Sequence, residues 1–320
     1  MKAILVENQQ LHWAEAPDPV CGVGEVKIQV AATAVNRADL VQASGGYPPP
    51  PGASDILGLE CAGVVTEIGE GVDRFQPGDA VCALLSGGGY AEQVVVPAGQ
   101  VLPIPAGVSM LEAAALPEVF ATAYLNLYIE ARLSVQEKVL LHAGASGVGT
   151  AAIQMLKTTH NPCFVTAGSA DKVAACVALG ADGGFDRHQG SFLSVVQEWS
   201  GGGVDVILDP VGAQYLADNI TALGLNGRLV LIGLMGGVSA EVNLGAMMMK
   251  RIRVIGSTLR ARSIGEKAQI LDGLHREVWP HFESGAIKPI IETSMPLEQA
   301  GEAHKLVAGN ETVGKVTLVL

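Results

Sequence analysis

The strongest indication of the fold is one stretch of sequence, Val139-Leu140-Leu141-His142-Ala143-Gly144-Ala145-Ser146-Gly147-Val148-Gly149. A continuous apolar run ends, glycines turn the chain, and a helical pattern begins, which is the context of a dinucleotide-binding fingerprint. Glycine there permits a tight turn and close approach of the backbone to a pyrophosphate, and the helix N-terminus offers free N–H groups to phosphate. Gly144 and Gly149 hold the first and third fingerprint positions, while Ser146, with Gly147 beside it, replaces the middle glycine. We therefore expect cofactor contacts from every residue of 144–149.

The pattern on either side of this stretch predicts two kinds of domain. Downstream, predicted strands alternate with helical segments, as in a doubly wound parallel sheet. The strands are expected at 163–167, 184–186, 204–208, 227–232 and 252–256, and the helices at 170–179, 191–199 and 213–223. Upstream, short Val- and Ile-rich segments at 2–6, 26–33, 62–68 and 92–96, separated by turn signals, predict a β-barrel or sandwich. Further helices are expected at 110–131, 265–283 and 298–308, and a last strand, 314–319, should return to the first domain.

Composition excludes several function classes. The chain has 320 residues with a net charge of −12, which argues against binding to a nucleic-acid backbone. No apolar run reaches the roughly 18 residues of a membrane span, and the apolar N-terminus is too short for a signal peptide. The five cysteines are scattered, with no paired spacing, so we expect reduced thiols in a cytoplasmic protein.

The end of the second predicted strand indicates which dinucleotide binds. NAD enzymes place an acid there, on the ribose hydroxyls. This chain instead has Gly168 and Ser169, followed by Lys172, and Arg187 follows the next short strand. A hydroxyl and cations accept a 2′-phosphate that an acid would repel, so NADPH is favoured over NADH. Asp171 is the counter-evidence, unless it caps the helix that follows.

Several short landmarks are spread over essentially the whole chain. They are Asn36-Arg37-Ala38-Asp39-Leu40, Pro49-Pro50-Pro51-Gly52, Leu57-Gly58-Leu59-Glu60, Gly78-Asp79, Ala114-Ala115-Leu116-Pro117, the glycine segment 137–157 and Gly233-Leu234-Met235-Gly236-Gly237. Together they resemble a known family, the zinc-free medium-chain dehydrogenases/reductases of the quinone oxidoreductase (zeta-crystallin-like) type. The resemblance is strongest to the tumour-suppressor-inducible branch.

The resemblance implies an α/β architecture: a GroES-like β-barrel domain formed by both chain ends, with a Rossmann domain inserted. The expected boundaries are 1–118, 119–258 and 259–320, with the cofactor in the cleft between the domains. Family members are usually dimers, so we expect a homodimer. Met247-Met248-Met249 would then pack in the core or in the dimer interface.

The resemblance also indicates whether this chain has the residues that bind zinc in zinc-dependent relatives. Zinc-dependent relatives carry a cysteine at the start of the 36–40 segment and a histidine in the 58–60 segment. Here these positions hold Asn36 and Leu59, and the cysteines of the structural zinc site are absent. A site made from Glu60, Cys61 and a histidine is the remaining alternative. We expect no metal, and hence no Lewis acid to activate an alcohol.

Family resemblance also assigns the remaining site residues. Tyr47 would lie beside the nicotinamide, unless it only packs against prolines. Asn36 and Asp39 would hydrogen-bond the acceptor or Tyr47, although Asp39 could instead cap a helix. Ser146 would lie under the pyrophosphate or the nicotinamide as a catalytic-site residue, unless it serves the turn alone. Further cofactor contacts are expected from Thr122, Gly233, Leu234, Met235 and Arg260. Thr122 could instead serve helix packing, and Arg260 could be an exposed arginine. His142 is interpreted as a structural histidine with satisfied hydrogen bonds or as a hydrogen-bond donor to the cofactor.

The function expected from all of this is NADPH-dependent reduction of a small-molecule quinone or activated carbonyl acceptor by hydride transfer. Without a metal, reduction of an already electrophilic acceptor is favoured over alcohol oxidation. Two alternatives stay open: reduction of an enone or enoyl thioester, and an NADPH-binding structural or partner-binding protein with little turnover.

Overall fold

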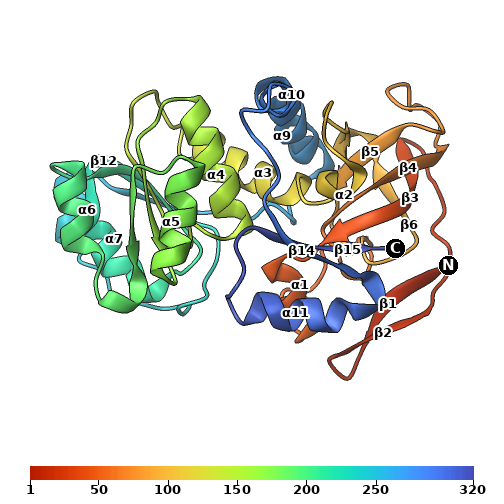
Figure 1. Ribbon diagram of the computed structural model, residues 1–320, viewed down its shortest axis with the longest axis horizontal. Coiled ribbons are helices and arrows are strands. Elements are labelled where there is room, and N and C mark those ends of the chain that lie inside the picture. The colour runs from red at the N-terminus through yellow and green to blue at the C-terminus, as the bar shows by residue number, and fades with distance from the viewer. The chain divides into compact units, whose positions relative to one another are not determined.

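The structure, a computed structural model, describes all residues 1–320 and divides into two compact units. Unit 1 comprises Met1–Ala121 and Leu259–Leu320, and unit 2 comprises Thr122–Thr258. Figure 1 shows unit 1 as the red-to-yellow and blue parts of the chain, because both ends contribute to it. No helix is both long enough and apolar enough to cross a membrane.

Unit 1 is built on a sheet in which the order of strands is β14-β15-β3-β4-β5-β7, with β6 pairing to β3. The strands are β3 (Glu25–Ala34), β4 (Glu60–Ile68), β5 (Ala80–Leu84), β6 (Gln93–Pro97), β7 (Val101–Pro103), β14 (Ile291–Pro296) and β15 (Lys315–Val319). A separate hairpin joins β1 (Lys2–Glu7) to β2 (Gln10–Glu15). The last strand, β15, pairs antiparallel with β3, so the predicted return of the C-terminus to the first domain is confirmed.

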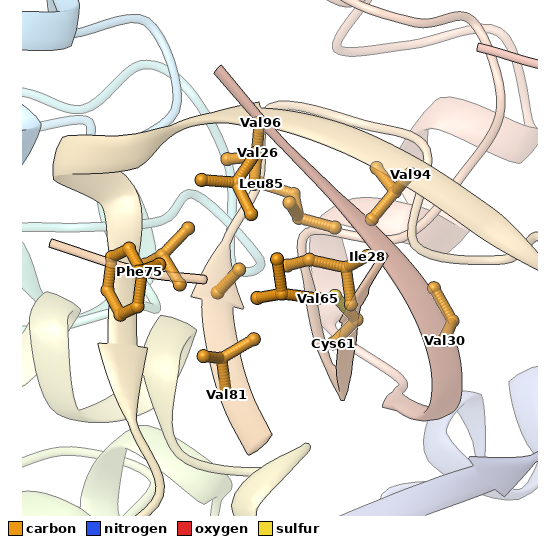
Figure 2. Packing of buried hydrophobic residues seen from close by; sticks show 12 residues of the cluster. Val26, Ile28, Val30, Cys61, Val65, Phe75, Val81, Leu85, Val94 and Val96 are labelled. Carbon is orange, nitrogen blue, oxygen red and sulfur yellow. The ribbon is translucent and has the colours of Figure 1, made fainter. Parts of the chain in front are cut away.

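The core of this sheet is aliphatic, as the low aromatic content predicts. Val26 and Ile28 of β3 point toward Val65 of β4 and toward Val94 and Val96 (Figure 2). Alternate residues of each strand face this core, since side chains alternate between the two faces of a strand. The helices of the unit are α1 (Arg37–Ala43), α2 (Met110–Ala113), α3 (Pro117–Tyr124), α9 (Ile264–Glu277), α10 (Trp279–Glu283) and α11 (Ala300–Ala308), of which α3 runs on into unit 2.

Unit 2 is a parallel sheet with the strand order β10-β9-β8-β11-β12-β13. The strands are β8 (Val139–Leu141), β9 (Cys163–Ala167), β10 (Gly183–Asp186), β11 (Val204–Asp209), β12 (Leu223–Leu231) and β13 (Arg253–Gly256), and every neighbouring pair is parallel. The helices α4 (Gly147–Thr158), α5 (Ala170–Leu179), α6 (Leu193–Ser200), α7 (Leu216–Ala222) and α8 (Leu244–Lys250) connect them (Figure 1). This is the doubly wound order, so the predicted Rossmann sheet is confirmed.

Two predicted helices are interrupted in the structure. The segment 110–131 forms α2, then α3, and then a π-helix, Leu125–Glu130, because Pro117 cannot continue the hydrogen bonding of α2. The segment 265–283 ends α9 before Trp279 and restarts as α10, with Pro280 near the start of that helix. The break at Pro117 places Glu118 in the first turn of α3.

Candidate functional site

The glycine turn after β8 has the geometry of a phosphate-binding site. Ser146 caps α4, and its Oγ accepts from the Gly149 N–H at 3.1 Å. A Cβ built on Gly149 would lie 2.4 Å from the Gly144 carbonyl oxygen, and one on Gly144 would lie 2.6 Å from Val165 Cβ. Both glycines are therefore required for the turn to pack closely. The N–H groups of the first helical turn have no intrahelical acceptor, so this cradle fits a dinucleotide pyrophosphate.

The predicted 2′-phosphate residues lie together at the ends of β9 and β10. Asp186 of β10 pairs with Ala167 of β9, which brings Arg187 next to Gly168. A Cβ on Gly168 would lie 3.5 Å from Arg187 Nε. Ser169 caps α5 by accepting from the Lys172 N–H at 3.2 Å, so it, rather than Asp171, is the N-cap of this helix. Arg187 is exposed and its guanidinium lies next to Gly168, so a cation is available to an anion at this edge.

The second glycine loop follows β12. Gly233 approaches the loop after β11 so closely that a Cβ there would lie 2.8 Å from the Pro210 carbonyl oxygen. Leu234 and Met235 are half exposed beside it. Thr122, in α3, is partly buried, and its carbonyl accepts from Asn126 Nδ2 at 2.7 Å. The cofactor roles of these residues stay predictions.

A buried hydrogen-bonded chain crosses the carboxyl ends of the strands in unit 2. His142 binds Thr166 Oγ1 through Nδ1 at 2.9 Å and Asn219 Oδ1 through Nε2 at 2.7 Å. Asn219 Nδ2 in turn donates to Asp209 Oδ2 at 2.9 Å. The interpretation of His142 as a satisfied structural histidine is confirmed. Asp209 and Asn219 were missed, because in the sequence they belong to an ordinary strand end and helix.

Tyr47 in unit 1 is fixed in an unusual conformation. Its φ is +48°, in the left-handed region that non-glycine residues rarely adopt. Arg260 Nη1 donates to the Tyr47 carbonyl at 3.1 Å, and the guanidinium lies 5.3 Å from the centre of the ring. Arg260 also donates to the Ser86 carbonyl and to Gln42 Oε1. Tyr47 remains 37% exposed, so a constrained aromatic ring faces outward, as a ligand platform would require.

Arg260 differs from one of the two expectations for it. It is buried, so the alternative of an exposed arginine is wrong. Its guanidinium is committed to Ser86, Tyr47 and Gln42 of its own unit. The structure therefore adds a role for Arg260, which is to hold the Tyr47 loop, while its predicted contact with the cofactor stays untested.

Asn36 and Asp39 lie in a buried polar cluster. The Asn36 side chain donates to Glu60 Oε1 at 2.8 Å and accepts from Lys315 Nζ at 2.6 Å. Lys315 Nζ also forms an ion pair with Glu60 at 2.8 Å. Asp39 is fully buried and accepts from the Asn36 and Gly58 N–H groups and the Tyr90 hydroxyl.

This cluster corrects two expectations. Asp39 has no exposed surface and caps α1 with Asn36, so direct contact with an acceptor does not fit the structure. The Asn36 amide has both hydrogens committed, to Glu60 and to the Ala34 carbonyl, and cannot donate to a ligand. Their sequence motif signals a buried capping box and charge network rather than a contact with the acceptor.

Glu118 is a third acid beside this cluster, and the sequence analysis missed it. Its N–H donates to Glu60 Oε2 at 2.9 Å. Burial raises the pKa of the Glu118 carboxyl to about 8, Glu60 and Asp39 add to the shift, and Lys315 opposes it. Nearby cations are committed elsewhere, since Lys315 binds Glu60 and Lys267 donates to Ser86. Its only sequence signal was its place directly after the Ala114–Pro117 landmark.

The stability of the protein should therefore fall as pH rises from 7 to 9. An unfolded glutamate has a pKa of about 4.3, so between about pH 4.3 and 8 the folded state binds more protons than the unfolded state. Its free energy of unfolding must then decrease with rising pH. Replacing Glu118 with Gln should stabilise the protein at pH 9 by about 1–2 kcal/mol, and by progressively less toward pH 4.

Urea unfolding at several pH values measures this. The buried cysteines also lower stability between pH 7 and 9, because burial raises the pKa of their thiols and they ionise at about pH 8.5 only in the unfolded state. The contribution of Glu118 is therefore the difference between the Glu118→Gln and wild-type profiles, in which the cysteines cancel. Glu302→Gln, an exposed matched substitution, should leave the pH profile unchanged. A Glu118→Gln profile parallel to that of the wild type would contradict the assignment.

The residues at the former zinc positions do not form a zinc site. Leu59 has no donor atom, Asn36 and Glu60 bind Lys315, and burial raises the pKa of the Cys61 thiol well above its ordinary value. No group of three or more His, Cys, Asp or Glu side chains is arranged to hold a metal ion. This donor set does not suit zinc, which prefers thiolate and imidazole.

Comparisons with known proteins place this chain in a family. Residues 22–106 match the alcohol dehydrogenase GroES-like domain, and residues 147–274 match the zinc-binding dehydrogenase domain. The chain is 31% identical to quinone oxidoreductase of Mus musculus over 307 residues, covering 94% of this chain and 91% of that protein. It is 29% identical to the synaptic vesicle membrane protein VAT-1 homolog of Homo sapiens over 327 residues, covering 98% and 83%. The crystal structure of Escherichia coli quinone oxidoreductase complexed with NADPH superposes with a TM-score of 0.87 at 26% identity, covering 100% of this chain and 99% of that one.

A Rossmann unit with a fingerprint turn, joined to a GroES-like unit, defines the class of nucleotide-dependent oxidoreductases. This chain belongs to the medium-chain dehydrogenase/reductase family, as an oxidoreductase related to the quinone oxidoreductases. The narrower resemblance to the tumour-suppressor-inducible branch stays a prediction.

Proposed function

We propose that this chain binds NADPH and reduces quinone-type acceptors by hydride transfer without a metal. The observation that carries the proposal is the pairing of the glycine cradle at 144–149 with the Arg187 guanidinium over Gly168, at a strand end that lacks the usual acid. Similarity to a quinone oxidoreductase that was solved with NADPH supports the same cofactor.

The chain's own residues would bind and orient the reactants. Free N–H groups at the start of α4 would bind the pyrophosphate, and Arg187 with Ser169 and Lys172 would bind the 2′-phosphate. Tyr47, held by Arg260, would present its ring and hydroxyl to a planar acceptor. Bound NADPH would supply the hydride. The hydride supplies two electrons and one hydrogen, so a hydroquinone needs one further proton, which water can donate, and no dedicated acid is required.

Following NADPH absorbance tests this proposal. We expect oxidation with 9,10-phenanthrenequinone and with a simple benzoquinone. Faster oxidation with an enone or with crotonyl thioester would instead identify the alternative acceptor class. Tight NADPH binding without turnover of any acceptor would contradict the enzyme assignment and favour the binding-protein alternative.

Cofactor choice has its own prediction. Replacing Arg187 with Ala should raise the KM for NADPH about tenfold, because one or two charge-assisted hydrogen bonds to the phosphate would be lost. The KM for NADH should change little. His188→Ala, at the exposed neighbouring residue, is the matched control. Steady-state kinetics with both cofactors measure this, and wild-type rates that are equal with NADH would contradict the NADPH assignment.

We also propose that the protein is a homodimer through unit 2. Strand β13 is an edge of the sheet, with an unpaired backbone, and Met248 and Met249 on α8 are 73% and 75% exposed. A second copy could pair with this edge about a two-fold axis and cover the methionines. Light scattering should show a dimer for the wild type and a monomer for Met248→Glu with Met249→Glu. A wild-type monomer would contradict the proposal.

A further inference from the structure

The buried chain Thr166–His142–Asn219–Asp209 in unit 2 has a defined direction. Asp209 Oδ1 accepts from the Val211 N–H at 2.6 Å and the Gly212 N–H at 3.2 Å. Burial raises the pKa of the Asp209 carboxyl to about 6, so at neutral pH it is ionised and can only accept hydrogen bonds. Asn219 must therefore turn its NH2 toward Asp209 and its oxygen toward His142.

The direction continues through the imidazole. Since Asn219 Oδ1 is an acceptor, His142 Nε2 carries the proton, and Nδ1 accepts from the Thr166 hydroxyl. Burial lowers the pKa of His142 to about 4, so the ring is neutral. The rings of Phe192 and Tyr215 lie 4.8 and 4.7 Å from the imidazole, centre to centre. Along the hydrogen-bonded chain from Thr166 to Asp209, each donor therefore faces an acceptor, and no two donors or two acceptors oppose each other.

One end of this chain supports the fingerprint turn. His142 directly precedes Ala143 and Gly144, and its N–H donates to the Leu208 carbonyl of β11 at 3.1 Å. The Gly144 N–H donates to the carbonyl of Thr166 at 2.9 Å. The carboxyl ends of β8, β9 and β11 are therefore tied together at the turn that would bind the pyrophosphate.

The other end supports the second glycine loop. Asp209 fixes the loop at 210–212 through two backbone N–H groups. The carbonyls of that loop accept hydrogen bonds from the second glycine loop, at 233–237. The Val211 carbonyl accepts from the Gly236 N–H at 2.7 Å, and the Pro210 carbonyl accepts from the Met235 N–H at 3.2 Å. The loop predicted to contact the cofactor is therefore held by Asp209.

We propose that Asp209 and Asn219 are positioning residues of the dinucleotide site, which join the pyrophosphate turn at 144–149 to the loop at 233–237. The inference rests on the proposed function for its ligand. Strands β8 and β11 flank the point where the strand order reverses, which is where open parallel sheets bind ligands. An apolar core would hold the strands equally well, whereas this polar chain fixes the two loops in one geometry.

Two variants test the hydrogen-bonded chain: Asn219→Asp alone, and Asn219→Asp combined with Asp209→Asn, which exchanges the amide and the carboxylate. Asn219→Asp would set two carboxylates 2.9 Å apart and remove the donor to Asp209. Asp209→Asn with Asn219→Asp would restore every side-chain bond of the hydrogen-bonded chain, because the new amide at 209 donates to the new carboxylate at 219; only the second contact of the Gly212 N–H, with Oδ2 at 3.2 Å, would be lost. The oxygen of that amide would still accept from Val211 and Gly212, and the carboxylate would accept from His142 Nε2.

Hydrogen exchange in the cofactor-free protein is the first measurement. We expect the amides of Val211, Gly212, Met235 and Gly236 to exchange at least about tenfold faster in Asn219→Asp, a loss of about 1.4 kcal/mol of local protection. The double variant should return close to the wild-type rates. Unchanged exchange in the single variant, or equal acceleration in both, would overturn the inference whether or not NADPH binds.

Binding is the second measurement. Asn219→Asp should weaken NADPH at least about tenfold, yet change the affinity for 2′,5′-ADP, which carries only the adenosine half, by less than about threefold. The double variant should restore NADPH affinity. Glu137→Gln, which breaks the Arg228–Glu137 ion pair in the same unit, should lower thermal stability and leave the ratio of the two affinities unchanged. Equal losses for both ligands in Asn219→Asp would overturn the inference, and a wild type that binds no NADPH would overturn the proposed function alone.

Discussion

Replacing Gly149 with Ala should remove NADPH binding, with a loss of affinity of at least about 100-fold, which is what a displacement of about 1 Å can cost at a site of this kind. The added Cβ would lie 2.4 Å from the Gly144 carbonyl oxygen and 2.6 Å from that of Ala143. Both atoms are backbone, so the turn itself must move. Ala143 already has a φ of +53°, which leaves the turn little freedom to adjust.

The same change should cost stability, by about 1–3 kcal/mol as for other overpacked sites. Isothermal titration with NADPH and urea unfolding measure the two effects. Gly301→Ala is the matched control, because a Cβ there meets nothing within 4 Å and lies in α11. It should leave binding unchanged and stabilise the protein by about 0.5–1 kcal/mol. NADPH affinity retained in Gly149→Ala would show that the turn does not carry the cofactor.

The fold could be predicted because its signals are local. An apolar run, a glycine turn and a helical period are adjacent in the sequence, and the helix expected at 170–179 is α5 with the same bounds. The strands β2, β5, β7 and β14 were missed. Each is short, at three to six residues, and pairing with a neighbouring strand defines it more than its own sequence does. Pro117 and Pro280 were visible, yet the apolar period around them masked the breaks.

The candidate site was less predictable, because its contacts join distant parts of the chain. Gly168 and Arg187 could be paired in advance, since neighbouring parallel strands end at one edge. No local pattern could show that Arg260 holds Tyr47, or that Lys315 binds Asn36 and Glu60. The sequence shows the residue types of the landmark at 36–40, whereas the fold decides that Asn36 and Asp39 bind other buried groups of unit 1.

The Lys315 ammonium is the cation of that buried cluster, and replacing it with Met should destabilise the protein by about 3–5 kcal/mol. Lys315 donates to the Val35 carbonyl at 2.8 Å and to Asn36 Oδ1 and lies 2.8 Å from Glu60, all in unit 1. Methionine fills a similar volume, so the loss is chiefly one of charge. Glu60 would remain buried without a counterion, beside Asp39 and Glu118.

A second substitution, Glu60→Gln, distinguishes the loss of the Lys315 charge from the loss of its packing. Glu60→Gln combined with Lys315→Met removes both charges, so most of the lost stability should return, since a buried ion pair and a neutral replacement are often similar in energy. Lys305→Met, at the exposed ion pair with Glu302, should shift the urea midpoint little. If the double variant were as unstable as Lys315→Met alone, the packing of the lysine stem would be the dominant contribution. Recovery would show that the charge of Lys315, on β15, stabilises the protein through Glu60 on β4.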